Sequence, residues 1–208
     1  VGSEMCIRDR WLFCMLNNFG GRLGLHGHLD NLANNIPKVF NETKYIAGIG
    51  ITPEASVNNP VLYDFLFETI WQDDASQKME VIDLDTWLDD YATRRYGAES
   101  ESANQAWDIL KETVYKASLN GLGQGAPESV VNARPNLTIG AASTWGNAVI
   151  SYEKGDLEEA AALLLADYDK LKDSAGYQYD LANVLQQVLS NSAQEYQKGM
   201  SAAVSYTH

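Results

Sequence analysis

The chain has 208 residues, enough to bury the hydrophobic core of one domain or of two small ones. Its 28 acidic and 15 basic residues leave a formal net charge of −13, which argues against nucleic acids and anionic membrane surfaces as partners because both are bound by basic patches. No apolar run approaches the roughly 20 residues of a membrane-spanning helix.

The two ends of the chain are related through their coding sequence. Residues 5–9 can be encoded by ATG TGT ATA AGA GAC, and the reverse complement of that string encodes residues 204–208. One adapter sequence read on opposite strands produces this relation, and the opening VGSEMCIRDR resembles a translated sequencing-library adapter. We therefore expect residues 1–10 and 204–208 to be artefactual and the remainder to be an internal piece of a longer protein, with a native tail as the alternative.

Two short apolar runs with a helical pattern between them open the remaining chain. Residues 11–16 form an unbroken apolar run closed by turn-forming residues, which is typical of a strand buried on both faces. Apolar residues then recur at spacings of three and four, which predicts a helix ending near Pro37. Residues 45–51 form the second run. Strand, helix and strand in this order indicate a βαβ unit with parallel strands.

The pattern after the second strand is helical. Asn59 is a good N-cap, Pro60 suits the first helical position, and an apolar face continues to Ile70. Four later segments also have helical periodicity: residues 83–97, capped by Asp83 or Asp85 and ended by Gly97, then 103–117, 157–172 and 179–199. The sequence therefore predicts an α/β part followed by an all-α part, with the boundary near residues 72–83.

Glu54 is the strongest candidate for chemistry. It closely follows the second strand, and functional side chains of parallel α/β folds lie just past the carboxyl ends of strands. Pro53 fixes its own φ angle and restricts Thr52, so the loop can hold a carboxylate in the geometry that nucleophilic or acid–base work requires. A solvated loop acid, or an acid favoured by the start of the next helix, is the alternative.

Other candidates carry weaker signals. His26 and His28 alone make a poor metal site, and Cys14 is the only cysteine outside the adapter-like ends, so we expect no metal centre. Arg94 and Arg95 could clamp an anion, although the end of a helix favours cations in any case.

The tryptophans divide into one loop residue and a group at core spacing. Trp145 lies in a segment of low charge before a helix, where it could stack on a sugar or fill a gap between helices. Trp71, Trp87 and Trp107 are predicted to pack in the core.

Three blocks of the sequence together resemble one enzyme family. The blocks are FCMLNNFGGRLGLHGHL, GIGITPEASVNNPVLYDFLFETIW and WLDDYATRRYG. In order and spacing they resemble the α-N-acetylglucosaminidases of glycoside hydrolase family 89. The likeness continues through GYQYDLANVLQQVL and covers nearly all of residues 11–203, with the first two blocks the most specific.

The resemblance implies a division of the chain. Family members have a small N-terminal domain, a central (β/α)8 TIM-like barrel that holds the active site, and an α-helical C-terminal domain that packs over it. Residues 11–77 would supply the last strands and helices of the barrel, and residues 78–203 most of the helical domain. The α/β and all-α patterns of the residues agree with this division.

The resemblance also implies a reaction. The family removes terminal α-linked N-acetylglucosamine with retention, using two glutamates. Glu54 matches the nucleophile, whereas the acid–base glutamate would lie upstream of this chain, so the chain alone should be inactive. Phe13, where some members have tryptophan, is implied to line the sugar pocket. Four further residues share that implied role: Leu16, Asn17, Asn18 and Trp145.

The implied partner is a glycan that ends in N-acetylglucosamine, with no cofactor and no metal. We also expect an exported protein, in a periplasmic, extracellular or lysosome-like compartment, whose signal lies outside this sequence. A non-catalytic carbohydrate-binding or helical scaffold protein that keeps the fold is the alternative. The presence or absence of the upstream glutamate would distinguish the two.

Overall fold

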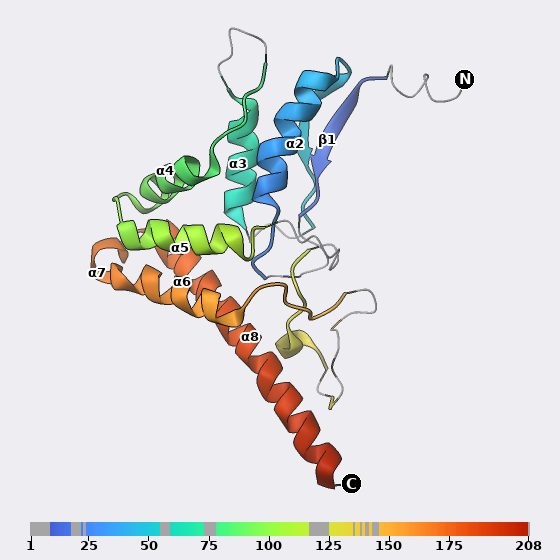
Figure 1. The fold of residues 1–208 in the computed structure, drawn as a ribbon, viewed down its shortest axis with the longest axis vertical. Helices are drawn as coiled ribbons and strands as arrows, with labels where there is room; N and C mark the ends of the chain where they lie inside the picture. Colours follow the sequence, from blue (N-terminus) through green and yellow to red (C-terminus); the bar gives the residue numbers. More distant parts are fainter. Residues whose placement is uncertain are drawn as a thin grey trace.

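The computed structural model describes residues 9–17, 22, 24–54, 59–72, 78–116, 125–134, 136, 137, 139, 142 and 146–207. A βαβ unit is followed by helices (Figure 1). The elements are β1 (Trp11–Met15), α2 (Leu29–Glu42), β2 (Ile46–Ile51), α3 (Pro60–Ile70), α4 (Leu84–Tyr96), α5 (Glu101–Glu112), the 3-10 helix η1 (Val130–Asn132), α6 (Lys154–Ala166), α7 (Tyr168–Leu171) and α8 (Ala175–Thr207). This order confirms the predicted fold class, α/β followed by all-α.

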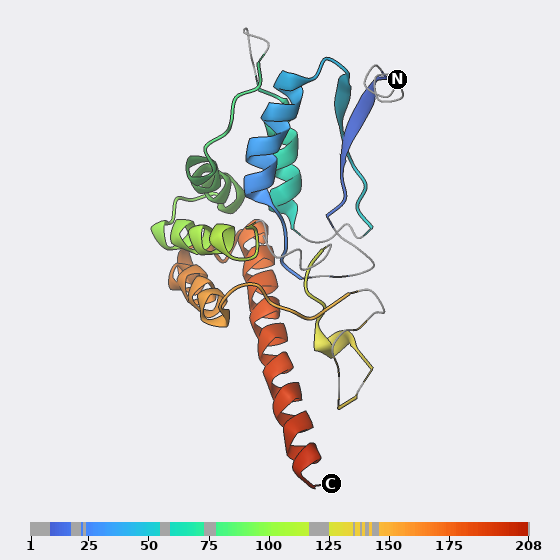
Figure 2. The ribbon, with the colours of Figure 1, turned by 45° about the vertical axis from the view of Figure 1, so that its right-hand side comes forward.

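The two strands pair in parallel, as the βαβ pattern predicts. Phe13 lies opposite Ile49 and Met15 opposite Ile51. These four side chains share one face of the sheet and pack against the hydrophobic core, to which α2 and α3 also contribute. Figure 2 shows α2 and α3 on one side of the two strands. Alternation along the strands therefore directs one set of residues to the helices.

The other face of the sheet is open. Leu12 is 60% exposed and Cys14 is also exposed, and their partners across the sheet, Gly48 and Gly50, have no side chains to cover them. The sequence predicted that the first strand, residues 11–16, is buried on both faces. The structure differs because the described helices next to the sheet all lie on one side of it (Figure 2).

Several helix boundaries differ from the sequence prediction. α2 continues through Pro37 to Glu42, although the missing N–H of proline removes one helical hydrogen bond. Pro37 is buried beside Ile36, and the apolar face continues to Phe40, so packing outweighs the lost bond. The helix predicted over residues 157–172 is divided at Asp167 into α6 and α7.

α8 is longer than predicted. It begins at Ala175 and extends through residues 204–207, which the sequence analysis set aside. Its lower half leaves the helical bundle (Figure 1). None of the described helices has the combination of length and apolar character needed to cross a membrane.

One hydrophobic core extends from the sheet through the helices. Trp87 and Trp107 are buried in it, as predicted. Trp71 is 81% exposed, so the prediction that it packs in the core is wrong. Trp71 is the C-cap of α3, and beyond the last helical turn the spacing of residues no longer decides which side they face.

A largely buried ion pair joins α4 to α8. Arg95 donates two hydrogen bonds to Asp180, from Nε at 2.6 Å and from Nη2 at 3.0 Å. The Tyr96 hydroxyl donates to the same carboxylate at 3.1 Å and accepts from Trp107 Nε1 at 3.0 Å. Arg94 pairs with Glu68 at the surface. The two arginines therefore bind carboxylates of the chain itself.

Candidate active site

The carboxyl ends of β1 and β2 lie side by side. Pairing ends with Met15 opposite Ile51, and the Thr52 N–H donates to the Met15 carbonyl at 3.0 Å. Residues that follow parallel strands reach the same edge of a sheet. Asn17 and Glu54 therefore belong to one edge, which faces the helical region (Figure 1).

The structure places the predicted site residues differently with respect to this edge. Glu54 is exposed and accessible to a ligand, and Leu16 is also exposed. Asn17 is buried, and its Nδ2 donates to the His26 carbonyl at 3.3 Å. Phe13 lies within β1, and its side chain is partly buried against the hydrophobic core. Two predicted residues lie outside the described part of the chain: Asn18 and Trp145.

Asn59 connects the segments that follow the two strands. It precedes α3, is 1% exposed, and its Oδ1 accepts from the His26 N–H at 3.1 Å and from the Tyr115 hydroxyl at 3.2 Å. Its Nδ2 donates to the Gly24 carbonyl at 3.2 Å. The predicted N-cap position is confirmed, but the side chain caps nothing, because the backbone is left-handed (φ 56°, ψ 48°) and not extended as N-caps usually are.

Residues 24–29 belong to the connection between β1 and α2. They are also hydrogen-bonded to the helical region. The Gly27 N–H donates to the Val114 carbonyl and the Leu29 N–H to the Tyr115 carbonyl, both at 3.0 Å. The Leu25 N–H donates to Gln187 Oε1 on α8, also at 3.0 Å. The helical region therefore fixes the backbone beside the strand ends.

Glycines allow this close approach. A Cβ atom at Gly27 would collide with the Leu62 side chain, and one at Gly24 would lie 2.9 Å from Gln187 Oε1. Neither position has room for a larger residue without movement of its neighbours.

A second link between the regions is the ion pair of Arg22 and Glu128. Arg22 Nε lies 3.6 Å from Glu128 Oε1, and the side chains are only 8% and 4% exposed. Glu128 Oε2 also accepts from the Ala142 N–H at 2.6 Å. A Cβ atom at Gly146 would collide with both members of the pair. Residues 142 and 146, on either side of position 145, thus lie against the Glu128 carboxylate, and Gly146 also lies against the Arg22 side chain.

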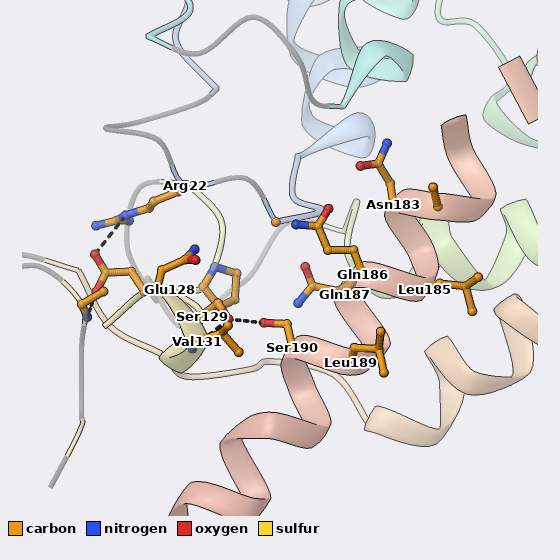
Figure 3. Close-up of a pocket in the computed structure, with 15 residues that line it drawn as sticks. Arg22, Glu128, Ser129, Val131, Asn183, Leu185, Gln186, Gln187, Leu189 and Ser190 are labelled. Carbon is orange, nitrogen blue, oxygen red and sulfur yellow. Dashed lines mark hydrogen bonds and ion pairs between the residues drawn. The ribbon is translucent and has the colours of Figure 1, made fainter. Parts of the chain in front are cut away.

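Figure 3 shows this pair at one end of a cavity of about 560 Å³. The cavity lies between the segment around η1 and one face of α8, and the Ser190 hydroxyl donates to the Ser129 hydroxyl at 2.6 Å. Leu185 and Leu189 line the α8 side.

The two histidines show no arrangement for a metal. Their rings meet edge to face with centroids 5.0 Å apart. Burial, with smaller contributions from the nearby His28 and Arg22, lowers the pKa of His26 to about 4. Among the described residues, no group of three histidine, cysteine, aspartate or glutamate side chains could hold a metal ion.

Sequence reasoning missed the residues that tie this edge together. No local sequence pattern predicts their contacts, because they come from segments far apart in the chain. They are Arg22, Asn59, Tyr115, Glu128 and Gln187. The glycines of GRLGLHGH were the only signal, since closely spaced glycines indicate that the backbone is approached closely.

Comparisons with known proteins match most of the chain. Residues 3–73 match a family model described as the alpha-N-acetylglucosaminidase (NAGLU) tim-barrel domain. Residues 87–208 match the model of the alpha-N-acetylglucosaminidase (NAGLU) C-terminal domain, which alone covers more than half of the chain.

Individual relatives are similar over most of the chain. The human alpha-N-acetylglucosaminidase is 33% identical over 181 residues, which are 86% of this chain and 22% of that protein. A family 89 glycoside hydrolase from Clostridium perfringens, solved in complex with PUGNAc, is 42% identical with a TM-score of 0.88, over 96% of this chain and 22% of its own.

A further structure shows a variant with bound substrate. It is CpGH89 from Clostridium perfringens, with two Glu→Gln substitutions, in complex with its substrate GlcNAc-α-1,4-galactose. It is 43% identical with a TM-score of 0.85, over 93% of this chain and 21% of its own. The chain thus spans about a fifth of the length of these relatives.

Proposed function

The chain belongs to the α-N-acetylglucosaminidase family, glycoside hydrolase family 89, and on this basis we propose that it is part of a retaining exo-α-N-acetylglucosaminidase. We call the full-length protein the parent enzyme. Its substrate would be a glycan that ends in α-linked N-acetylglucosamine. The bound GlcNAc-α-1,4-galactose of the Clostridium perfringens relative supports this substrate class.

Glu54 would be the nucleophile. The observation that supports this role most is its position: an exposed carboxylate three residues after β2, beside the carboxyl end of β1, in a member of this family. In the first step a carboxylate oxygen of Glu54 bonds to C1 of the sugar while the bond from C1 to the leaving oxygen breaks. In the second step water attacks C1 and releases Glu54, so two inversions give retention.

A second carboxyl group must donate a proton to the leaving oxygen and then remove one from the water. In retaining enzymes the two groups stand about 5–5.5 Å apart. We assign this role to a glutamate of the parent enzyme upstream of this chain. The relative with two Glu→Gln substitutions and bound substrate supports a pair of glutamates. The chain alone would then lack turnover.

The sugar would be bound by residues of both regions. Leu16, Asn17 and Asn18 follow β1 and would line the pocket from the barrel. Trp145 would close it from the helical region, and this is supported by Ala142 and Gly146, which lie against the Arg22 and Glu128 pair. Phe13, within β1, would also line the pocket, as the resemblance implies.

The experiment is substitution of the nucleophile with chemical rescue. In the parent enzyme, Glu54→Gln should lower kcat/KM for an aryl α-N-acetylglucosaminide by about 10³-fold or more. Azide should restore turnover of Glu54→Ala and yield the glycosyl azide of inverted, β configuration, since azide occupies the place of the lost carboxylate.

The matched control is Glu42→Gln. Glu42 is an exposed glutamate at the end of α2, next to the start of β2 and so at the opposite edge of the sheet. Its loss should leave turnover unchanged. Near-normal turnover of Glu54→Gln would refute the proposal. Binding of the sugar by a parent enzyme that has no turnover would favour a carbohydrate-binding protein instead.

A further inference from the structure

We propose that Asn59 is a positioning residue for Glu54, which fixes the end of the nucleophile loop to the segment after β1 and to the helical region. The inference rests on the proposed role of Glu54 and extends it to a residue outside the reacting groups. It also makes the helical region, through Tyr115, a direct support of the nucleophile loop.

The loop that carries Glu54 is anchored at both ends. It leaves the sheet at Thr52, whose N–H is held by the Met15 carbonyl at 3.0 Å. It enters α3 at Asn59, whose side chain makes the three hydrogen bonds described above. Only residues 53–58 lie between these anchors. Glu54 therefore lies two residues after one fixed point of the backbone and five residues before the other.

The backbone of one residue, His26, joins the two segments that follow the strands. The His26 N–H donates to Asn59 at 3.1 Å, and the His26 carbonyl accepts from Asn17 at 3.3 Å. Asn17 follows β1 and Asn59 ends the loop that follows β2. The distance between the two segments is thus set through His26 by two asparagine side chains.

Tyr115 brings the helical region into this arrangement. It lies in the turn after α5, is fully buried, and donates its hydroxyl to Asn59 Oδ1 at 3.2 Å. Burial raises the pKa of Tyr115 well above its ordinary value, so the hydroxyl keeps the proton that it donates. The Tyr115 carbonyl accepts from Leu29, which fixes the turn against the same segment.

The backbone of Asn59 provides a clean variant. Its left-handed conformation is one that glycine adopts without strain and that most other residues avoid. Asn59→Gly therefore removes the three side-chain bonds and keeps the backbone. Tyr115→Phe removes one of the bonds and keeps the ring. Thr69→Ala is the control, because Thr69 is buried on the same helix and its hydroxyl bonds only to the Phe65 carbonyl within α3.

Two measurements on the parent enzyme test the inference. The first is kcat and KM on an aryl α-N-acetylglucosaminide. Asn59→Gly should lower kcat about 10- to 100-fold with KM changed less than about threefold, because a displaced nucleophile loop weakens attack on C1 more than binding. Tyr115→Phe should lower kcat by less, in the same direction. Thr69→Ala should lower the melting temperature and leave kcat unchanged.

The second measurement is amide hydrogen exchange in the peptide that spans residues 46–60. Exchange should be faster in Asn59→Gly than in the parent enzyme, and unchanged in Thr69→Ala outside α3. If kcat of Asn59→Gly stays within about twofold of the unsubstituted enzyme, or if Thr69→Ala loses kcat equally, the inference is wrong.

The outcomes separate this inference from the proposed function. A parent enzyme without turnover whose exchange still responds to Asn59→Gly would refute the function and keep the positioning role. If the parent enzyme is active and Asn59→Gly changes neither kcat nor amide hydrogen exchange, only the positioning role is refuted. If Asn59→Gly does not fold, the same two measurements, kcat and amide hydrogen exchange, are made on Tyr115→Phe and test the inference there.

Discussion

The two regions of the molecule differ in how completely they are packed. In the helical region, α4 to α8 enclose a core in which Leu110, Leu164 and Tyr177 are almost fully buried. In the sheet region, β1 and β2 are covered on one side only, and Leu12 is exposed on the other. The relatives are several times longer than this chain. We infer that further strands of the parent barrel cover the open face.

The better packed region is therefore not the one that carries the candidate nucleophile. The helical region contributes fully buried residues to the common core and contains the ion pair of Arg95 and Asp180, whereas the candidate nucleophile follows a sheet with an uncovered face. The contacts of Asn59, Gln187 and Glu128 cross between the regions. The helical region therefore supports the edge where the proposed reaction takes place.

The largest effect is expected from the ion pair of the helical region. Arg95→Met leaves Asp180 buried without its partner and should lower the free energy of unfolding by about 3–5 kcal/mol, measured by urea unfolding followed by circular dichroism. Burial raises the pKa of Asp180, and the hydrogen bonds and charge of Arg95 oppose this rise. The charged form of Asp180 therefore depends on its contact with Arg95.

Arg94→Met is the matched control for this change. Its partner Glu68 is about half exposed, and such surface pairs contribute less than about 1 kcal/mol. Equal losses in the two variants would contradict the description of Arg95 as a buried support. Arg95→Met combined with Asp180→Leu should recover much of the stability, because no charge is then left unpaired.

Hydrogen exchange compares the two regions in one experiment. Amides of α5 and α8 should exchange at least about 100-fold more slowly than those of β1 and β2 in the chain as it stands, which corresponds to about 3 kcal/mol of opening free energy. Mass spectrometry of peptic fragments gives both rates. Equal protection would show that the open sheet is as stable as the helical core.

His26 should make stability depend on pH at the junction of the regions. Its pKa is about 4 in the folded chain against 6.5 for the ordinary group. Between these values the unfolded chain binds a proton that the folded chain does not. His26 therefore does not reduce the free energy of unfolding above pH 6.5. As the pH drops from 6.5 towards 4, His26 lowers the free energy of unfolding by at most about 3 kcal/mol.

Urea unfolding at pH 7 and at pH 4.5 measures this loss. His26→Gln should remove it, while His28→Gln, which also removes the ring contact, controls for packing. A loss of stability of the same size in the His26→Gln variant would assign the pH dependence to other groups.

The smallest effect is expected on the open face. Leu12→Thr should change the stability of this chain by less than about 0.5 kcal/mol, because the side chain is mostly exposed and threonine suits a strand. In the parent enzyme the same change should cost about 2 kcal/mol, since we infer that the face is buried there. Thermal melting of both proteins makes the comparison, and equal effects would refute the covered face.

Periodicity was sufficient to predict most of the fold. The apolar runs located β1 and β2, and Asp83, Gly97 and Pro60 marked helix ends that the structure confirms. Pro37 misled the prediction, because burial against the core compensates for a lost backbone bond that sequence rules treat as decisive. Trp71 misled it because it lies just past a helix end.

The sequence predicted the candidate nucleophile of the site but not the hydrogen bonds around it. Glu54 follows from strand order and the stiffness that Pro53 gives, both of which are local. The bonds of Asn59 to Gly24, His26 and Tyr115 join segments 33–56 residues apart in the chain, so they depend on the tertiary fold. A left-handed Asn59 also looks like an ordinary N-cap in the sequence.

Trapping of the covalent intermediate tests the role of Glu54 directly. The parent enzyme is incubated with an activated, fluorinated N-acetylglucosamine derivative that slows release of the sugar, digested with a protease, and analysed by mass spectrometry. We expect one sugar attached to the peptide that contains Glu54, and no adduct in Glu54→Gln. A sugar attached to any other carboxylate of the active enzyme would contradict the assignment.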